Sequence, residues 1–151
     1  MPEWIVEVEN LVKKFGSFAA VDDISFNVQQ GEIFGFLGAN GAGKTTAMRI
    51  LCGLLTPTSG KAKVCGYNVY TQSEQIKANI GYMSQRFSLF DDLSVWDNIC
   101  FYAGIYKMSP KEIEDAGNSL MQKLDIRSHK KRLAGSLPLG WKQKLAFSIA
   151  I

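Results

Sequence analysis

The sequence contains few residues of the kinds that stabilise secreted domains, bind metals or cross membranes. Its three cysteines, Cys52, Cys65 and Cys100, are odd in number and far apart. This pattern argues against a disulfide framework or a zinc site, and favours reduced thiols in the core of a cytosolic protein. The lone histidine, His129, is flanked by polar residues and is expected in a solvated loop. No apolar run approaches the roughly 18 residues of a transmembrane helix, and the N-terminus lacks the features of a signal peptide.

An excess of one charge sign is also missing. The chain has 17 Lys and Arg against 14 Asp and Glu, a net charge of +3. This balance gives no strong case for binding to nucleic acid or to a membrane surface, so no nucleic-acid partner is expected. With 46% hydrophobic and 21% charged residues in a chain of 151, the composition is that of an ordinary globular protein with a real core.

Residues 38–45 are the most informative feature that is present. They read Gly-Ala-Asn-Gly-Ala-Gly-Lys-Thr, which fits the phosphate-binding P-loop pattern G-x-x-x-x-G-K-[ST]. An apolar run at 32–37 precedes them and is predicted to be a strand, and a helix is predicted from about Gly43 to Leu54. This strand–loop–helix context is the one that the motif requires.

The P-loop residues suit the binding of a nucleotide's phosphates. Glycines let backbone N–H groups curl around an anion, and the start of a helix adds partial positive charge. Lys44 can reach the β- and γ-phosphates, and the Thr45 hydroxyl can hold Mg²⁺. The predicted phosphate-binding residues are Gly38, Ala39, Asn40, Gly41, Ala42, Gly43, Lys44, Thr45 and Thr46.

The chain before residue 94 is predicted to mix strands and helices. Residues 5–8 and 24–28 alternate apolar and polar side chains, which predicts antiparallel strands with one wet face. Residues 56–60 are rich in turn formers, and a short strand is expected at 61–64. A helix is predicted around 73–78, followed by an apolar strand at 80–84.

From about Ser94 the pattern becomes helical. Ser94 can cap a helix that reaches about Tyr106, and Ser109 begins a capping box with proline at the first helical position. A buried stripe is expected along the second helix, and a last helix is predicted from near Leu139 to the end of the chain. The stripe comprises Ile113, Ala116, Leu120 and Leu124. The expected organisation is one composite domain, with antiparallel strands mostly in 1–37, a P-loop core in 38–93 and a helical segment in 94–151.

Residues around the P-loop resemble the ATP-binding subunit of ABC transporters, and the resemblance covers all 151 residues. Residues 11–16 look like the family's opening, where an aromatic ring stacks on adenine, and Phe15 would be that ring. Val21 would be the apolar neighbour of the base. A core position is the alternative for both side chains.

Residues 80–85 are similar to the family's strand that ends in the Q-loop glutamine. The resemblance implies that Gln85 binds Mg²⁺ or its water through the amide oxygen and senses the γ-phosphate. A solvated loop glutamine is the alternative.

Residues 137–144 occupy the position of the family's signature motif, normally Leu-Ser-Gly-Gly-Gln followed by a basic segment. The implied contacts to ATP bound by a partner subunit come from Leu137, Pro138, Leu139, Gly140 and Trp141. The motif departs from the usual pattern, because proline brings neither a hydroxyl nor a backbone N–H. Ser136 is a candidate substitute for the hydroxyl. The Leu-Pro-Leu-Gly-Trp-Lys-Gln sequence resembles a variant of ABC-2 type exporters.

The resemblance implies an incomplete ABC ATPase fold: an α/β P-loop NTPase core with an antiparallel β subdomain and a helical subdomain. The family's second acidic strand, catalytic glutamate and switch histidine are expected after Ile151, so no catalytic residue is assigned within the chain, and these residues alone are expected to be inactive. ATP and Mg²⁺ are the implied cofactors. A second ATPase subunit and a multi-span membrane permease are the implied partners, on the cytoplasmic face of a membrane, and the implied activity is ATP-driven export.

Other functions remain open from sequence. The altered signature slightly favours a regulatory site that binds ATP without turnover. A soluble ABC protein that acts on ribosomes or DNA is disfavoured by the modest charge. A GTPase or small-molecule kinase is disfavoured because no Asn-Lys-x-Asp motif is present and neither the Q-loop nor the signature would be needed.

Overall fold

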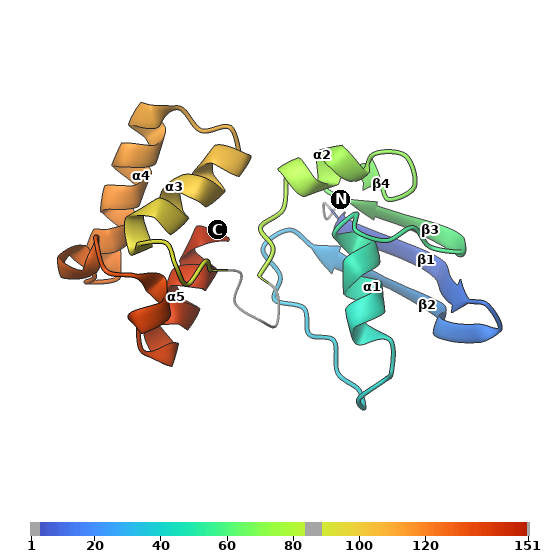
Figure 1. Ribbon diagram of the computed structural model, residues 1–151. Helices are drawn as coiled ribbons and strands as arrows, with labels where there is room; N and C mark the ends of the chain where they lie inside the picture. The colour runs from blue at the N-terminus through green and yellow to red at the C-terminus, as the bar shows by residue number, and fades with distance from the viewer. Residues whose placement is uncertain (1–3, 84–88, 151) are drawn as a thin grey trace. The chain divides into compact units, whose positions relative to one another are not determined.

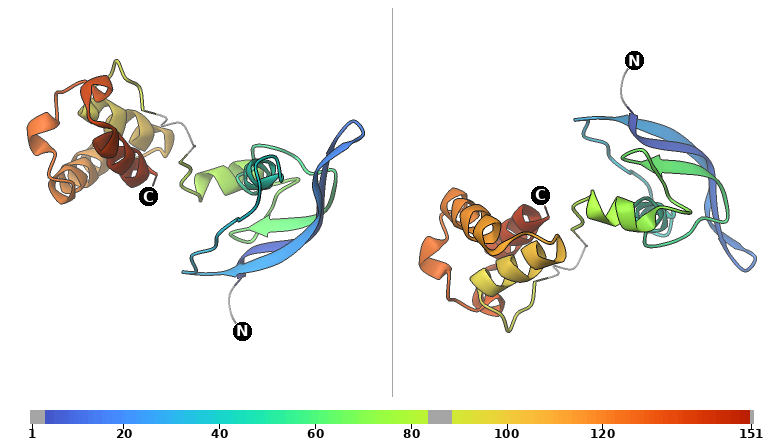
Figure 2. Two further views of the ribbon diagram at one scale, coloured as in Figure 1. Left: turned by 90° about the horizontal axis from the view of Figure 1, so that it is seen from below. Right: turned by 90° about the horizontal axis from the view of Figure 1, so that it is seen from above.

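The computed structural model describes residues 4–83 and 89–150. The chain divides into two compact units, Met1–Ile80 and Gly81–Ile151, which are described separately (Figures 1 and 2). None of the helices within the described residues is both long and apolar enough to cross a membrane.

The first unit is built on a four-stranded antiparallel sheet. The strands pair in the order β2-β1-β3-β4. Their bounds are Trp4–Phe15 for β1, Phe18–Gln29 for β2, Ser59–Val64 for β3 and Tyr67–Asn68 for β4. The strands predicted at 5–8, 24–28 and 61–64 are therefore confirmed, although β1 and β2 are much longer than the alternating segments. β4 was not predicted, and the expected turn at 56–60 ends inside β3.

Two helices cover one side of this curved sheet (Figure 2). They are α1, Lys44–Leu51, and α2, Ser73–Ala78, and both were expected at these places. α1 ends earlier than predicted, since Gly53 takes a φ of +67° and turns the chain. The core between helices and sheet consists of Val8, Leu11, Ile50, Leu51, Ala62, Val64, Val69 and Ile76.

The apolar run at 32–37 was predicted to be a strand, and this prediction is wrong for the structure. No described strand pairs with these residues, and Ile33 and Leu37 are 99% and 95% exposed. Apolar composition indicates that a segment is suited to a buried strand, but a strand also needs neighbours that complete its hydrogen bonds. Phe34 and Phe36 instead pack on Phe26, with ring centroids 5.0 and 5.1 Å away.

The strand predicted at 80–84 is also not formed in residues 80–83, for the same reason. Ser84, its last residue, lies outside the described residues. Here too an apolar segment has no paired strand beside it within the described part of the chain.

The second unit is helical and its boundaries follow the predicted caps. The helices are α3, Val95–Ile105, α4, Pro110–Lys123, and α5, Leu139–Ile149, with 3-10 turns at Arg127–His129 and Ala134–Ser136. Ser94 and Ser109 each form a capping box, with Asp97 and Glu112. The serine's hydrogen bonds hold the pKa of Glu112 below its usual value. α5 begins at Leu139, as predicted, and ends at Ile149, one residue short of the last residue that the structure describes.

The helical unit has its own core, and one predicted core position is wrong. The core residues are Val95, Ile99, Met121, Ile126, Leu137 and Leu145. In α4 the buried positions are Gly117 and Met121, whereas Ala116 is exposed. The cause is Trp96, because a Cβ at position 117 would lie 2.7 Å from its ring. Only glycine lets the helix approach this ring so closely.

The cysteines and the histidine depart only slightly from expectation. All three cysteines are free, with Cys52 buried and the other two half-buried. Burial raises the pKa of the Cys52 thiol, as expected for an unreactive core cysteine. His129 was expected in a solvated loop, but it is half-buried and its ring lies 6.2 Å from that of Trp141.

Candidate nucleotide-binding site

The loop of residues 38–43 joins the extended segment at 32–37 to the start of α1 (Figure 1). Gly43 precedes the helix with a φ of +81°, a conformation that side chains disfavour. A Cβ at this position would also overlap the carbonyl oxygen of Ala20 in β2. Both the left-handed backbone and the close approach to the sheet therefore require glycine at position 43.

The Lys44 ammonium is held against the loop. Its Nζ donates hydrogen bonds to the carbonyl oxygens of Gly38 and Ala39, at 2.7 and 2.6 Å. An ammonium has three donors, so a further acceptor such as a phosphate oxygen can be bound without breaking both contacts. The Lys44 ammonium therefore lies beside the backbone of the loop.

The start of α1 supplies further donors. The first N–H groups of a helix have no acceptor within it, and here they belong to Lys44, Thr45 and Thr46. No acidic residue lies in the first turn of α1, so nothing there offsets the positive end of the helix dipole. Thr45 is exposed at this end, where its hydroxyl is accessible to a ligand.

A hollow of about 440 Å³ lies beside the loop. This volume falls within the range of about 300–1,000 Å³ that is usual for small-molecule sites. It is lined by β2, by the end of the extended segment, by the loop and by α1. The lining residues are Phe18, Ala19, Ala20, Val21, Asp22, Ile24, Phe36, Leu37, Gly41, Ala42, Gly43, Lys44 and Ala47.

The two side chains predicted to contact the base have different positions. Val21 is 4% exposed and lines the hollow, so it is both a core residue and a wall of the candidate site. Phe15 is 52% exposed at the end of β1 and does not line the hollow. Its cross-strand neighbour Phe18 does line it, and was missed by the sequence analysis. The hairpin pairing of these two aromatics was the signal that could have found it.

Gln85, the predicted Mg²⁺ ligand of the Q-loop, lies outside the described residues. Of the predicted metal ligands, the structure therefore places only Thr45. The described parts of the chain contain no cluster of three or more His, Cys, Asp or Glu side chains that could hold a metal ion.

The predicted signature residues lie at the start of α5, in the helical unit. Pro138 is the N-cap of the helix and makes no side-chain cap. Leu137 is buried and Trp141 half-buried against the unit's core, whereas Leu139 and Gly140 are exposed. The Ser136 hydroxyl donates to the Leu133 carbonyl and accepts from Arg132, so its proton is already used in the local turn.

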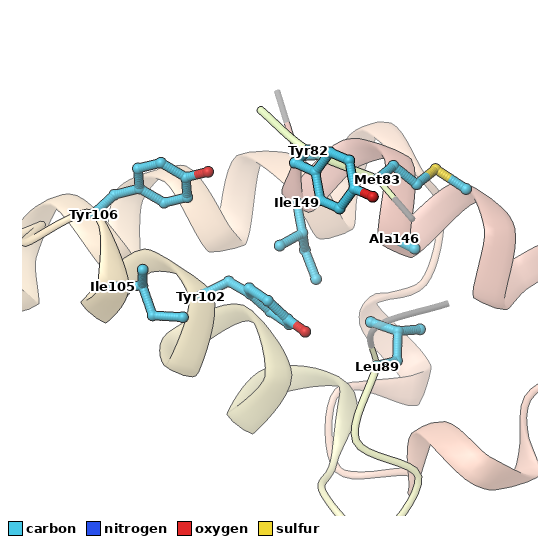
Figure 3. A pocket seen from close by; sticks show the side chains of 9 residues that line it. Tyr82, Met83, Leu89, Tyr102, Ile105, Tyr106, Ala146 and Ile149 are labelled. Atoms are coloured by element: carbon cyan, nitrogen blue, oxygen red, sulfur yellow. The ribbon is translucent and has the colours of Figure 1, made fainter. Parts of the chain in front are cut away.

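A smaller apolar pocket of about 140 Å³ lies within the helical unit (Figure 3). α3, α5 and the residues that directly follow these two helices provide most of its walls, and the sequence analysis did not anticipate it. The lining residues are Tyr82, Met83, Leu89, Tyr102, Ile105, Tyr106, Ala146, Ile149 and Ala150. None of these side chains is charged, so this pocket does not offer a phosphate site.

A family model described as ABC transporter matches residues 21–151. The chain belongs to the ABC transporter family. It is 40% identical over 149 residues to "Probable multidrug ABC transporter ATP-binding protein YbhF" of Escherichia coli strain K12, covering 99% of this chain and 26% of that protein. It is 35% identical to "Bacitracin transport ATP-binding protein BcrA" of Bacillus licheniformis, covering 97% of this chain and 47% of that protein. The ABC chain described here thus spans about a quarter to a half of these relatives.

The fold agrees with this family. The structure of cbiO1 from Clostridium perfringens, described as part of the ABC transporter complex cbiONQ, matches with a TM-score of 0.83 and 25% identity. The match covers 98% of this chain and 61% of that one. The predicted fold class is confirmed as the mixed α/β ABC ATPase fold, of which the chain contains a part.

Proposed function

We propose that this ABC chain is the nucleotide-binding part of an ATPase subunit and that it binds MgATP at the P-loop. The observation that carries the proposal is the Lys44 ammonium, held beside the loop and the unblocked start of α1. A cation, a row of free N–H groups and an adjacent hollow are what a polyphosphate needs.

Each predicted residue has a role in this proposal. Lys44 and the backbone N–H groups of the loop offset the charge of the β- and γ-phosphates. Val21, as a wall of the hollow, contacts the base, and Phe15 at the hairpin stacks on it. The other loop residues position the backbone around the phosphates.

Mg²⁺ fits the donors that are present. This ion usually takes one or two protein ligands and completes its octahedron with phosphate oxygens and water. The exposed Thr45 hydroxyl, together with Gln85, would supply those ligands, and no cluster of carboxylates is needed. When bound, Mg²⁺ neutralises part of the phosphate charge.

For the whole protein we propose ATP hydrolysis that drives export by a multi-span membrane permease. Two such subunits would close on ATP at the cytoplasmic face of the membrane, each start of α5 contacting the partner's nucleotide. Support comes from the family and from the similarity to YbhF and BcrA, named for multidrug and bacitracin transport. The transported substrate would contact the permease, so the residues of this chain do not identify that substrate.

The experiment is a titration with labelled ATP. Lys44→Ala is expected to weaken binding by about tenfold or more, because a hydrogen bond to a charged group contributes about 1.5–3 kcal/mol. Lys61→Ala is the matched control, since Lys61 is an exposed cation of the same unit, and its ion pair with Glu9 joins β3 to β1 away from the loop. Equal affinity of the Lys44→Ala variant and the unmodified chain would contradict the proposal.

A second candidate function is a regulatory site that binds ATP without turnover. It is favoured by Pro138 at the start of α5, where no side chain caps the helix. Turnover measured with the full-length protein separates the two candidates: steady ATP hydrolysis that is lost in Lys44→Ala would exclude the regulatory one.

A further inference from the structure

Asn98 on α3 is a fully buried polar residue in an otherwise apolar core. Its side chain binds the backbone of the loop that precedes the helix. Oδ1 accepts from the Phe90 N–H at 2.8 Å, and Nδ2 donates to the carbonyl oxygens of Phe90 and Ser94, both at 3.0 Å. A third carbonyl, that of Leu93, lies 3.4 Å from Nδ2. One side chain therefore fixes both ends of the loop at 90–94.

The same loop is hydrogen-bonded to the segment that leads into α5. The N–H groups of Gly135 and Ala134 donate to the carbonyl oxygens of Asp91 and Leu93, at 3.0 and 2.9 Å. Directly after the loop, the Val95 N–H donates to the Arg132 carbonyl at 2.9 Å. Because these bonds join two backbones, the position of one segment sets the position of the other.

A side-chain ion pair attaches the loop to α5 itself. The Lys142 ammonium lies 2.9 Å from a carboxylate oxygen of Asp91, and the Lys142 side chain is only 17% exposed. Partial burial reduces the screening that weakens most surface ion pairs. The loop is thus connected to the first turn of α5 as well as to the segment before it.

We propose that Asn98 is a positioning residue for the start of α5, acting through the backbone of residues 90–94. The inference rests on the proposed function, in which Pro138, Leu139 and Gly140 contact the partner's nucleotide. The side-chain hydrogen bonds of Asn98 go to residues 90–94 and not to these three residues. It holds the loop, the loop holds residues 134–135 and Lys142, and these fix where α5 begins.

A purely structural role for Asn98 makes a different prediction. In that case its loss would weaken the helical unit as any core truncation does, without a selective effect on the start of α5. Met121→Ala provides this comparison, because Met121 is a buried core residue and makes no hydrogen bond to the loop through its side chain. Its truncation leaves a cavity and lowers stability generally.

Hydrogen exchange tests the proposal directly in the chain itself. In Asn98→Ala the amides of Ala134 and Gly135 are expected to exchange about tenfold faster or more, relative to amides in the middle of α4. The reason is that the carbonyl groups of Phe90 and Ser94 lose the Asn98 amide as their hydrogen-bond donor, so the loop at 90–94 opens more often. In Met121→Ala the same two sets of amides are expected to change together. Equal acceleration of both sets in Asn98→Ala would overturn the proposal.

Activity of the full-length protein gives a second readout. Compared with Met121→Ala at the same fraction folded, Asn98→Ala is expected to lower kcat by about tenfold, with the affinity for MgATP unchanged. Asp91→Asn, a milder variant at an exposed position, is expected to lower kcat in the same sense by a smaller factor. If kcat in both variants equals that of Met121→Ala, the proposal is wrong. If Lys44→Ala also leaves ATP affinity unchanged, the proposed function fails, while the exchange experiment still decides the role of Asn98.

Discussion

The start of α1 and the start of α5 are both loop-to-helix junctions to which the sequence assigns phosphate contacts, yet they are built differently. At α1 the junction is glycine with a left-handed backbone, and Lys44, the side chain proposed to contact phosphate, is held by nearby carbonyl groups. At α5 the junction is Pro138, and its neighbours Leu137 and Trp141 pack into the core of the helical unit. The first junction is prepared for an anion by local backbone geometry. The second depends on where the rest of its unit holds it.

Replacing glycine by alanine at Gly43, before α1, and at Gly140, in the first turn of α5, is expected to have the largest and most divergent effects. Gly43→Ala forces a side chain into a left-handed conformation and against the Ala20 carbonyl, so it is expected to cost about 2 kcal/mol or more and to abolish ATP binding. Gly140→Ala meets no atoms within 4 Å and is expected to stabilise α5 by up to about 1 kcal/mol. Urea denaturation and ATP titration check both variants. Similar effects at the two positions would remove the contrast between the junctions.

Phe15→Ala is expected to weaken ATP binding by about 1–3 kcal/mol, the usual contribution of a ring stacked on a base. Binding of inorganic triphosphate should be unaffected, since it has no base. Phe18→Ala is the comparison, because Phe18 rather than Phe15 lines the hollow. A selective loss for ATP in Phe18→Ala alone would transfer the stacking role to Phe18, and equal losses of both ligands would leave Phe15 without such a role.

The chain of 151 residues is expected to bind ATP without detectable hydrolysis. Hydrolysis needs a carboxylate that orients the attacking water. Among the residues that line the hollow, only Asp22 is acidic, and no acidic residue lies in the first turn of α1. Phosphate release by the purified chain is the measurement. Activity that disappears in both Lys44→Ala and Asp22→Asn would show that Asp22 orients water, and would contradict the expectation.

The smallest effect concerns the capping box of α4. The Ser109 hydrogen bonds lower the pKa of Glu112, so the folded state binds this proton less readily than the unfolded state. The resulting stability is present above the unfolded pKa, about 4.3 for glutamate, and is lost as the pH falls through the lowered folded value. Glu112→Gln is expected to lower stability slightly at pH 7, where the contribution of the carboxylate is present, and to leave it unchanged below the folded pKa, so that the acid part of the pH profile becomes flatter. An unchanged acid profile would contradict the assignment.

Features with a local cause were predictable from the sequence. The bounds of α2, the cap at Ser94, the capping box at Ser109 and the junction at Gly43 follow from residues within a few positions of each other. The predicted fold class also proved correct, because the P-loop, Gln85 and signature segments were read together as one family pattern.

Features that depend on residues far away in the sequence could not be predicted in this way. Residues 32–37 have the composition of a buried strand but lack paired strands among the described residues. Ala116 and Gly117 differ by one position on α4, and only the contact with Trp96 decides which of them is buried. Phe18 lines the hollow because of its hairpin register. Asn98 could not be distinguished from a solvated asparagine until the loop that it binds was visible.

The most direct test of the central claim is an amide NMR titration of the chain with MgATP. The account predicts that shifts saturate together in residues 38–46 and at Val21, whose side chain lines the hollow, while the amides of residues 137 and 139–141 stay unchanged in the absence of a partner subunit. In Lys44→Ala the same shifts should require about tenfold more MgATP or more. Shifts centred on the start of α5, or saturation at the same concentration in Lys44→Ala, would contradict the assignment of the nucleotide site.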